Sequence, residues 1–359
     1  MKPDYYLRVG QYELDFDALP MAQFSTFDER GCLHTVPRFT GVFLMTRDTS
    51  RVHAGDRVEF FIRRKKGKAW GPAVFSGDVL LREPRVDVRN GEQVPMVRVV
   101  ARGHLGRLDD IQVSGEKYEG TLDEMLNQWM GRHVWDLVDD VDIDVTQPDI
   151  FPDVIEVEEG TAWTFLAEVR RYCAIDVSIV TTGAPGLGRQ LTGTRRVLKI
   201  SDERTPDLVR DDVVKVDKVD LDEPAEELLA THPHIVPPSW MDQKTGGEYA
   251  RRVMASLTAL RTNGRAIIRN FDPDPGNPLR NPNQLVRFPG VSSKKVLAVQ
   301  GVKIYRDGPA VTARLTYSSR VMPYWVPHLM PGGCNARASP VGQRTHGVMG
   351  RLRGMGRQG

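Results

Sequence analysis

A glycine-rich loop is the first segment whose residue types could bind a ligand. Residues Gly183 to Gln190 (GAPGLGRQ) follow a strand-like run, and their outer glycines have the spacing of a phosphate-binding loop. Such a loop needs a Lys followed by Ser or Thr, whereas Arg189 and Gln190 stand at these positions. No helical pattern follows, so no helix N-terminus would receive phosphate. We therefore interpret the segment as a turn and predict no nucleotide site.

Histidine and cysteine are the next residue types that could carry chemistry. His232 and His234 flank a proline in a loop, but a metal site needs three or four convergent ligands. Three cysteines lie far apart in the chain, at Cys32, Cys173 and Cys334. They predict neither a disulfide framework nor a zinc knuckle. Cys173 falls on the apolar face of a predicted helix, which is typical of core packing. We predict no metal and no cofactor.

Carboxylates are abundant, and their spacing along the chain shows whether they could form a catalytic pair or belong to the exposed side of strands. Acids alternate with Val and Ile in residues 139–144 and 217–222. A glycosidase needs two carboxylates about 5–10 Å apart in a cleft. The alternation instead indicates the water-facing side of strands. Because no G-x-S-x-G nucleophile motif is present either, we predict that the chain is not an enzyme. A carboxylate pair assembled by folding stays open as an alternative.

Length and composition limit the class of protein. The chain has 359 residues, and about 150 residues per domain gives two or three domains. Hydrophobic residues make up 40%, and 49 basic against 47 acidic residues leave a net charge of +2. This balance excludes wholesale disorder and a generic polyanion binder. No signal peptide and no apolar run of about 20 residues is visible, so we expect synthesis in the cytoplasm without membrane insertion.

The first hundred residues carry strand patterns. Residues 56–64 (DRVEFFIRR) alternate, and a basic loop follows at residues 63–68. A long strand-like run then covers residues 73–88. Asn90-Gly91 is a strong hairpin signal because both central residues of a type I′ turn need positive φ. The returning strand is predicted at residues 94–101.

The middle of the chain changes to a helix and strand pattern. Thr121 and Glu124 form a predicted capping box at the start of a helix over residues 121–130. The tripeptide Glu-Gly-Thr precedes this helix at residues 119–121 and recurs 40 residues later at residues 159–161, again before a helix and a strand. We predict a small α/β domain with an internal duplication. A chance match of three residues is the competing explanation.

The second β region repeats the plan of the first. A third helix is predicted over residues 248–260, with Arg261 in its last turn and Gly264 just beyond. Strands at residues 296–305 and 310–318 form a predicted hairpin. Each β region has a short strand, a loop with paired Lys, a long strand broken by Gly, a tight turn and a returning strand. The similarity indicates two copies of one β-barrel, although antiparallel hairpins in general look alike.

These patterns together predict a mainly β protein with an α/β insert, in which two similar antiparallel β-barrel domains flank a small duplicated α/β domain. The first barrel is residues 1–106. The α/β domain is residues 107–202. The second barrel, with an inserted helix, is residues 203–330. Residues 331–359 form a C-terminal arm.

The arm has a composition that cannot build a core. It contains five Arg and eight Gly but no Asp, Glu or Lys, so its charge is +5. The arm either stays mobile or folds onto a partner. The residues that would bind such a partner are its arginines, Arg337, Arg344, Arg351, Arg353 and Arg357.

The arrangement resembles the baseplate hub, or tail hub, proteins of long-tailed bacteriophages, which are related to the N-terminal part of type VI secretion spike proteins. The likeness extends over about residues 1 to 320 and is one of order and pattern, without a catalytic signature. It is carried by the segments GDRVEFFI, FSGDVLLREPRV, VRVVARGHLGRLDDIQV, EGTLDEMLNQWM, EGTAWTFLAEVRRYCAIDVSIV, RRVLKI, EYARRVMASLTAL and VLAVQGVKIYRDGPAVTARLTYSS.

The resemblance implies a homotrimer at the virion tail tip. Two barrels per subunit would give a pseudo-six-fold ring that docks on a tail tube or distal tail protein. In this picture residues 213–221 would return to complete the first barrel. A spike, tail-tip or fibre protein would bind the other side, and the central channel would pass the tape-measure protein and then DNA. No appended lysozyme, needle or receptor-binding extension is expected, so the tip or spike function should lie in other chains, with the arm as a candidate connector.

Two other classes of function stay open. One is a tail-associated cell-wall hydrolase, and the other is a barrel that binds nucleic acid through the basic loop at residues 63–68 and the arm. The nature of the tail, contractile or flexible, and the host receptor are open as well.

Overall fold

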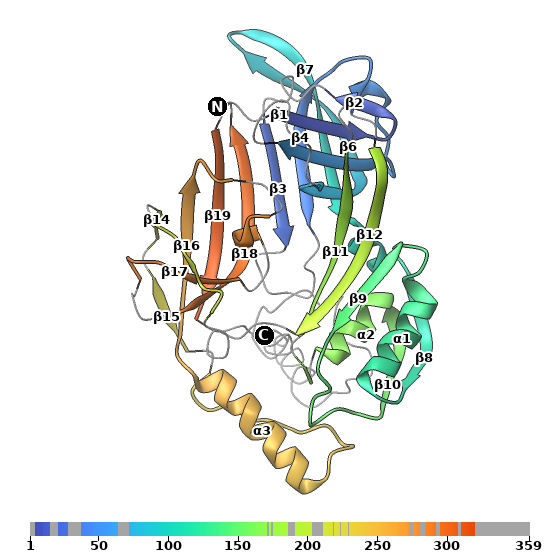
Figure 1. The fold of residues 1–359 in the computed structure, drawn as a ribbon, viewed down its shortest axis with the longest axis vertical. Coiled ribbons are helices and arrows are strands. Elements are labelled where there is room, and N and C mark those ends of the chain that lie inside the picture. The colour runs from blue at the N-terminus through green and yellow to red at the C-terminus, as the bar shows by residue number, and fades with distance from the viewer. Residues whose placement is uncertain are drawn as a thin grey trace, which may run out of the picture.

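The computed structural model describes residues 4–14, 21–27, 37–63, 72–170, 172–173, 175–185, 191–202, 211–217, 219–222, 224–228, 230–272, 276–280, 284–291, 295–307 and 310–319. The fold is mainly β, as predicted, with few helices (Figure 1). Among the described residues, no helix has the length and apolar character needed to cross a lipid bilayer.

One 14-stranded sheet contains the described strands of both β regions. Its order is β14-β16-β19-β18-β3-β4-β7-β6-β5-β1-β2, with β13, β15 and β17 paired off this path. The N-terminal strands are β1 (Asp4–Val9), β2 (Tyr12–Leu14), β3 (Met21–Phe27), β4 (Arg38–Leu44), β5 (Arg57–Arg63), β6 (Phe75–Arg89) and β7 (Glu92–Gly103). The C-terminal strands are β13 (Val214–Lys215), β14 (Asp220–Leu221), β15 (Ala225–Glu227), β16 (Arg261–Arg269), β17 (Leu285–Arg287), β18 (Leu297–Asp307) and β19 (Ala310–Ser318).

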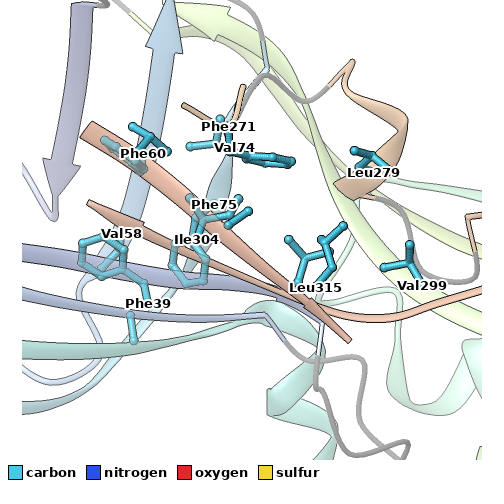
Figure 2. Packing of buried hydrophobic residues seen from close by; sticks show 14 of the residues in the cluster. Phe39, Val58, Phe60, Val74, Phe75, Phe271, Leu279, Val299, Ile304 and Leu315 are labelled. Carbon is cyan, nitrogen blue, oxygen red and sulfur yellow. The ribbon is translucent and has the colours of Figure 1, made fainter. Parts of the chain in front are cut away.

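Strand β3 joins the two halves of this sheet. It pairs with β18 on one side, where Phe24 lies opposite Ile304, and with β4 on the other, where Phe24 lies opposite Phe39. The apolar face is correspondingly a single buried cluster with residues from both halves. Figure 2 shows Phe39 and Phe75 of the first half together with Ile304 and Leu315 of the second. The two β regions are thus continuous here, and two separate barrels stay a prediction.

The hairpins in the two halves are built alike. Strands β5, β6 and β7 pair consecutively and antiparallel, and so do β17, β18 and β19. Each long central strand has a bulge, between Val79 and Leu81 in β6 and between Val299 and Gly301 in β18. The turn predicted at Asn90-Gly91 is confirmed, since φ is +53° and +84° at these residues.

The strand predicted at residues 213–221 belongs to the C-terminal half. Val214 and Lys215 pair with β17, and Asp220 and Leu221 pair with β16. The expectation that this segment completes the first barrel is therefore wrong. Val216, between these two short strands, is buried in the shared cluster.

Helix α3 (Gln243–Thr258) is displaced from its predicted position. It begins earlier because the Asp242 carboxylate caps it by accepting a hydrogen bond from the Thr245 N–H at 2.7 Å. It ends before Arg261, so the predicted helix stop at Arg261 and Gly264 is wrong. Gly264 lies in β16 opposite Tyr317. A Cβ at Gly264 would lie 2.3 Å from the Tyr317 hydroxyl oxygen, so this glycine makes room for a cross-strand ring.

The α/β part contains β8 (Gln112–Glu119), α1 (Leu122–His133), β9 (Asp140–Asp144), β10 (Val154–Thr161), α2 (Ala162–Val169), β11 (Ile175–Pro185) and β12 (Leu191–Asp202). Strands β8 and β10 form a two-stranded antiparallel sheet, and β11, β12 and β9 form a second sheet. Both helices lie against these sheets (Figure 1) and share a separate hydrophobic cluster with them.

The register of β8 and β10 follows the 40-residue repeat. Glu119 pairs with Val154. Replacing each residue by its equivalent in the other repeat, 40 positions later for Glu119 and 40 positions earlier for Val154, gives Glu159 with Ser114, which is also an observed pair. The capping box of Thr121 and Glu124 is confirmed. In both copies a glycine leaves room for the side chain that folds back over the helix start. A Cβ at Gly120 would lie 2.3 Å from Glu124 Oε2, and one at Gly160 would lie 2.4 Å from Thr164 Oγ1.

Candidate functional site

The residues singled out in the sequence do not converge on one site. The five arginines of the arm lie outside the described residues. His232 and His234 are both exposed in their loop, and no group of three or more metal-ligand side chains occurs in the described part of the chain. Asp140, Asp142 and Asp144 are exposed on β9, as predicted for the water-facing side of a strand.

Cys173 and the described part of the glycine-rich loop lie in the α/β part. Helix α2 ends at Val169, so Cys173 lies just beyond it and not on its face as predicted. The cysteine is nevertheless partly buried against the α/β cluster, with its backbone N–H donating to the Val169 carbonyl at 3.2 Å. Gly183 lies in β11, and residues 186–190 of the loop are outside the described part.

A buried ionic cluster lies where the large sheet meets the α/β part. It is centred on the short 3-10 helix η2 (His104–Asp109), which follows β7. Leu105 and Leu108 of η2 are buried in the α/β cluster. His104 and Arg107 on the same turn contact Asp78 of β6. One side of η2 therefore packs in the α/β part and the other side contacts the large sheet. We call the polar contact of Ser76, Asp78, His104 and Arg107 the ionic joint.

The geometry of the ionic joint is a set of charge-assisted hydrogen bonds. Arg107 donates from Nε to Asp78 Oδ2 and from Nη2 to Asp78 Oδ1, both at 2.7 Å. Nδ1 of His104 lies 3.3 Å from Asp78 Oδ2, and its Nε2 lies 2.9 Å from Ser76 Oγ. A bidentate arginine–carboxylate pair fixes the relative orientation of both groups. The cluster thus holds η2 on β6 in one register.

Electrostatics keep Asp78 ionised in this place. Burial by itself would raise the pKa of Asp78, but hydrogen bonds from His104 and Arg107 outweigh it and hold the pKa well below the ordinary range. The same contact raises the pKa of Arg107. A buried carboxylate is tolerated only when it is paired and hydrogen-bonded, and Asp78 meets both conditions.

The ionic joint contains the residue types of a catalytic triad, hydrogen-bonded in the order Ser, His, Asp. Two features distinguish it from the triad of an active hydrolase. His104 is only 3% exposed, and both oxygens of Asp78 are engaged by Arg107. We assign the arrangement a structural role, since its hydrogen bonds connect two units of the fold.

A second polar cluster lies within the α/β part. Glu116 of β8 accepts hydrogen bonds from the Tyr118 hydroxyl and from His133 Nε2, the latter at 2.8 Å. The Arg132 guanidinium lies over the Tyr118 ring, 4.7 Å from its centroid. Burial would raise the pKa of Glu116, but the bonds from Tyr118 and His133 lower it, while burial raises the pKa of Tyr118. The cluster ties the end of α1 to β8.

Sequence patterns did not reveal either cluster. Asp78 and Arg107 are 29 positions apart, and each looks like an ordinary surface charge in its own segment. The available signal was a His and an Arg three residues apart directly after a predicted strand, in the segment GHLGRLDD. That spacing places both side chains on one side of a helical turn.

Comparison with known proteins identifies the fold. No family model and no curated protein matches the chain. The solved 43 kDa tail protein of prophage MuSo2 from Shewanella oneidensis is 11% identical, covers 89% of this chain and 99% of its own, and has a TM-score of 0.54. The tail protein from Neisseria meningitidis MC58 is 13% identical, covers 92% and 100%, and has a TM-score of 0.56.

A component of the Escherichia coli type VI secretion system covers 87% of this chain and 76% of its own, at 9% identity and a TM-score of 0.49. The chain has the fold of the two tail proteins over nearly its whole length. The resemblance to phage tail proteins noted in the sequence is therefore confirmed at the level of the fold.

Proposed function

We propose that the chain is a structural tail hub of a long-tailed phage or a phage-like injection machine. The fold shared with two tail proteins over about nine-tenths of the chain supports a structural role in a tail. In this role the chain acts through its contacts with neighbouring proteins and has no catalytic site. Its place would be the virion tail tip.

The observation that carries the proposal is the repeated hairpin unit. β5-β6-β7 and β17-β18-β19 have the same antiparallel order, each with a bulge in the central strand. Three copies of the chain would present six such units in a pseudo-six-fold ring. A ring of this kind matches a six-fold tail tube or distal tail ring above and a three-fold tip below. The tape-measure protein and DNA would pass through its centre.

The domain boundaries follow from the same proposal, with one revision. Residues 1–106 form one barrel-like unit, residues 107–202 the α/β domain, and residues 203–330 the second unit. Residues 213–221 belong to the second unit, because they pair with β16 and β17.

The arm supplies the contact to the tip in this account. Arg337, Arg344, Arg351, Arg353 and Arg357 would bind an acidic surface of a spike, tail-tip or fibre protein, since the segment carries no acid of its own. Deletion of residues 331–359 should leave the fold and the ring intact but prevent assembly with the tip. Incorporation into tails, followed by mass spectrometry of purified particles, measures this. Normal incorporation of the tip protein by the truncated chain would reject the role.

A cell-wall hydrolase is the second candidate, and the Ser76–His104 distance of 2.9 Å is the observation in its favour. Release of soluble fragments from purified peptidoglycan at high protein concentration tests it. Activity that disappears in Ser76→Ala but persists in Ser50→Ala, an exposed serine elsewhere, would establish the hydrolase. We expect that the wild type and both variants release no fragments above the buffer blank.

A further inference from the structure

A line of basic residues crosses the large sheet. Lys303 of β18 lies directly opposite Arg314 of β19, and Arg38 of β4 lies directly opposite Arg102 of β7. Ser25 of β3 connects the two pairs, because it is the register partner of both Lys303 and Arg38. The strands β19, β18, β3, β4 and β7 are consecutive neighbours in the sheet (Figure 1). We call Arg314, Lys303, Arg38 and Arg102 the basic row.

The basic row lies on the face of the sheet that is opposite the hydrophobic cluster. Successive side chains of a strand point to opposite faces. Arg314 lies between Ala313 and Leu315, which are both buried in the cluster. Lys303 likewise precedes Ile304, which is buried there as well. The row therefore points away from the cluster, and its members on β19 and β4 are exposed.

The arrangement of the row is unfavourable for the chain by itself. Directly opposite residues of an antiparallel pair have Cβ atoms about 4.5–5.5 Å apart, and like charges at such positions destabilise the sheet. The row contains two like-charged pairs in one line across the sheet. Residues that break a local rule without an evident gain are expected at functional positions. The row therefore indicates an anionic partner.

Acidic residues of the chain contact only the borders of the row. Arg102, at one end, forms an ion pair with Asp110. Arg269 of β16, beyond the other end, pairs with Asp220 at 2.9 Å. Between these borders the sequences of β3, β4, β16 and β19 contain five Arg but no Asp or Glu. The middle of this face thus has a positive charge that suits a polyanion.

The positions beside the row have residue types that contact a phosphate backbone. Thr312 and Thr316 flank Arg314 on the same face of β19, and Thr40 lies on that face of β4. Arg265 of β16, an exposed residue, lies opposite Thr316. Arginine and hydroxyl side chains make many of the contacts that proteins form with phosphate and sugar.

The same face lacks the side chains that would anchor a protein partner. Protein interfaces are held by large apolar or aromatic residues at their centre. In the part of the chain that the structure describes, none of the exposed large hydrophobic side chains lies in the row or at the positions beside it. A surface of cations and hydroxyls without such an anchor suits a partner that is bound through its phosphates.

We propose that the basic row contacts the phosphate backbone of duplex DNA without reading its sequence. Contacts to phosphate carry no sequence information, so they allow DNA of any sequence to move past the protein. The inference rests on the proposed function for the passage of DNA, and it names the face of the sheet that DNA meets.

Fluorescence anisotropy tests the contact, with the full chain and a labelled DNA duplex of random sequence at a series of salt concentrations. The variant R38Q/K303Q/R314Q should bind at least about tenfold more weakly than the wild type at about 50 mM salt. The slope of log affinity against log salt should become less steep by about 3, because each lost phosphate contact removes about 0.9. R314Q alone, at an exposed position, should reduce the slope by about 1 and serves if the triple variant does not fold.

A matched control separates the row from net charge. K215Q/K244Q/R251Q removes the same charge at exposed positions on β13 and α3 and should bind DNA almost as tightly as the wild type. Both triple variants keep the arm and the basic loop at residues 63–68. Equal weakening by the two triple variants, or a wild type that does not bind DNA at low salt, would overturn the proposal. Unchanged DNA binding by R38Q/K303Q/R314Q, together with loss of a neighbouring tail protein, would also overturn it and assign the row to an acidic protein.

The outcomes for the row and for the hub are distinguishable. A wild-type chain that forms rings but does not bind DNA would overturn the role of the row and leave the hub standing. A monomeric wild-type chain that binds DNA through the row would count against the hub alone.

Discussion

Arg107 and Asp78 are joined by two parallel hydrogen bonds of 2.7 Å across the boundary between the large sheet and the α/β part. Asp78 lies on β6, and Arg107 lies on η2, whose leucines are buried in the α/β cluster. The leucines thus attach η2 to the α/β part, and the pair of Arg107 with Asp78 attaches η2 to the large sheet. In a hub that carries load between a tube and a tip, such a contact would fix how the two units are oriented.

Removal of Asp78 should weaken the fold more than removal of an exposed acid. Asp78→Ala leaves His104 and Arg107 without their shared acceptor, and loss of one partner of a buried pair costs about 3 to 5 kcal/mol. Because the Arg107 side chain is 41% exposed, we expect about 2 to 3 kcal/mol in urea unfolding. Glu83→Ala, which breaks the exposed pair with Arg98, is the control and should cost about 0.5 kcal/mol or less.

The contribution of Asp78 should depend on pH. Its pKa in the folded chain lies below its ordinary value of 3.8, so the folded state favours the ionised form. The resulting stability is present above about pH 4 and is lost as the pH falls below it, because protonation then favours unfolding. The difference in free energy of unfolding between wild type and Asp78→Asn should shrink between pH 6 and pH 3. A difference that is constant over this range would contradict the ionised assignment.

The two glycines near α1 should respond in opposite directions to alanine. A methyl group at Gly120 would collide with Glu124 Oε2, and φ is +111° there, so Gly120→Ala should destabilise by more than about 1 kcal/mol. Gly131 lies inside α1 with open space around its Cβ position, so Gly131→Ala should stabilise by about 1 kcal/mol. Thermal unfolding of both variants gives the sign directly. Equal effects would show that the capping geometry is unimportant.

Gly264 and Tyr317 should be energetically coupled. Gly264→Ala places a methyl group 2.3 Å from the Tyr317 hydroxyl oxygen and should cost about 1 to 3 kcal/mol. That hydroxyl is buried without a hydrogen-bond partner among the described residues, so Tyr317→Phe should be neutral or stabilising. The double variant should recover part of the loss of Gly264→Ala. Additive effects in the double-mutant cycle would argue against the close approach.

Local patterns predicted the elements that local physics determines. Asn90-Gly91 formed its turn, Thr121 capped its helix, and the strand Ala310–Ser318 was found at its predicted bounds. These features depend on backbone preference or on alternation of apolar residues within a few positions. The 40-residue repeat was also visible because its cap and glycine recur together.

Long-range features were not predictable in the same way. The pairing of β3 with β18 brings residues about 280 positions apart into register, and no local pattern encodes it. Gly264 resembled a helix stop because a glycine opposite a ring and a glycine after a helix look identical in sequence. The ionic joint was missed because the contact of Asp78 with Arg107 exists only after β6 and η2 have packed together.

Negative-stain imaging of the purified chain at micromolar concentration, with its solution mass, tests the central claim most directly. We predict three-fold rings with a central opening and a mass of about three times 40.3 kDa. A compact monomer at the same concentration, both alone and with a tail-tube or distal tail protein added, would contradict the hub.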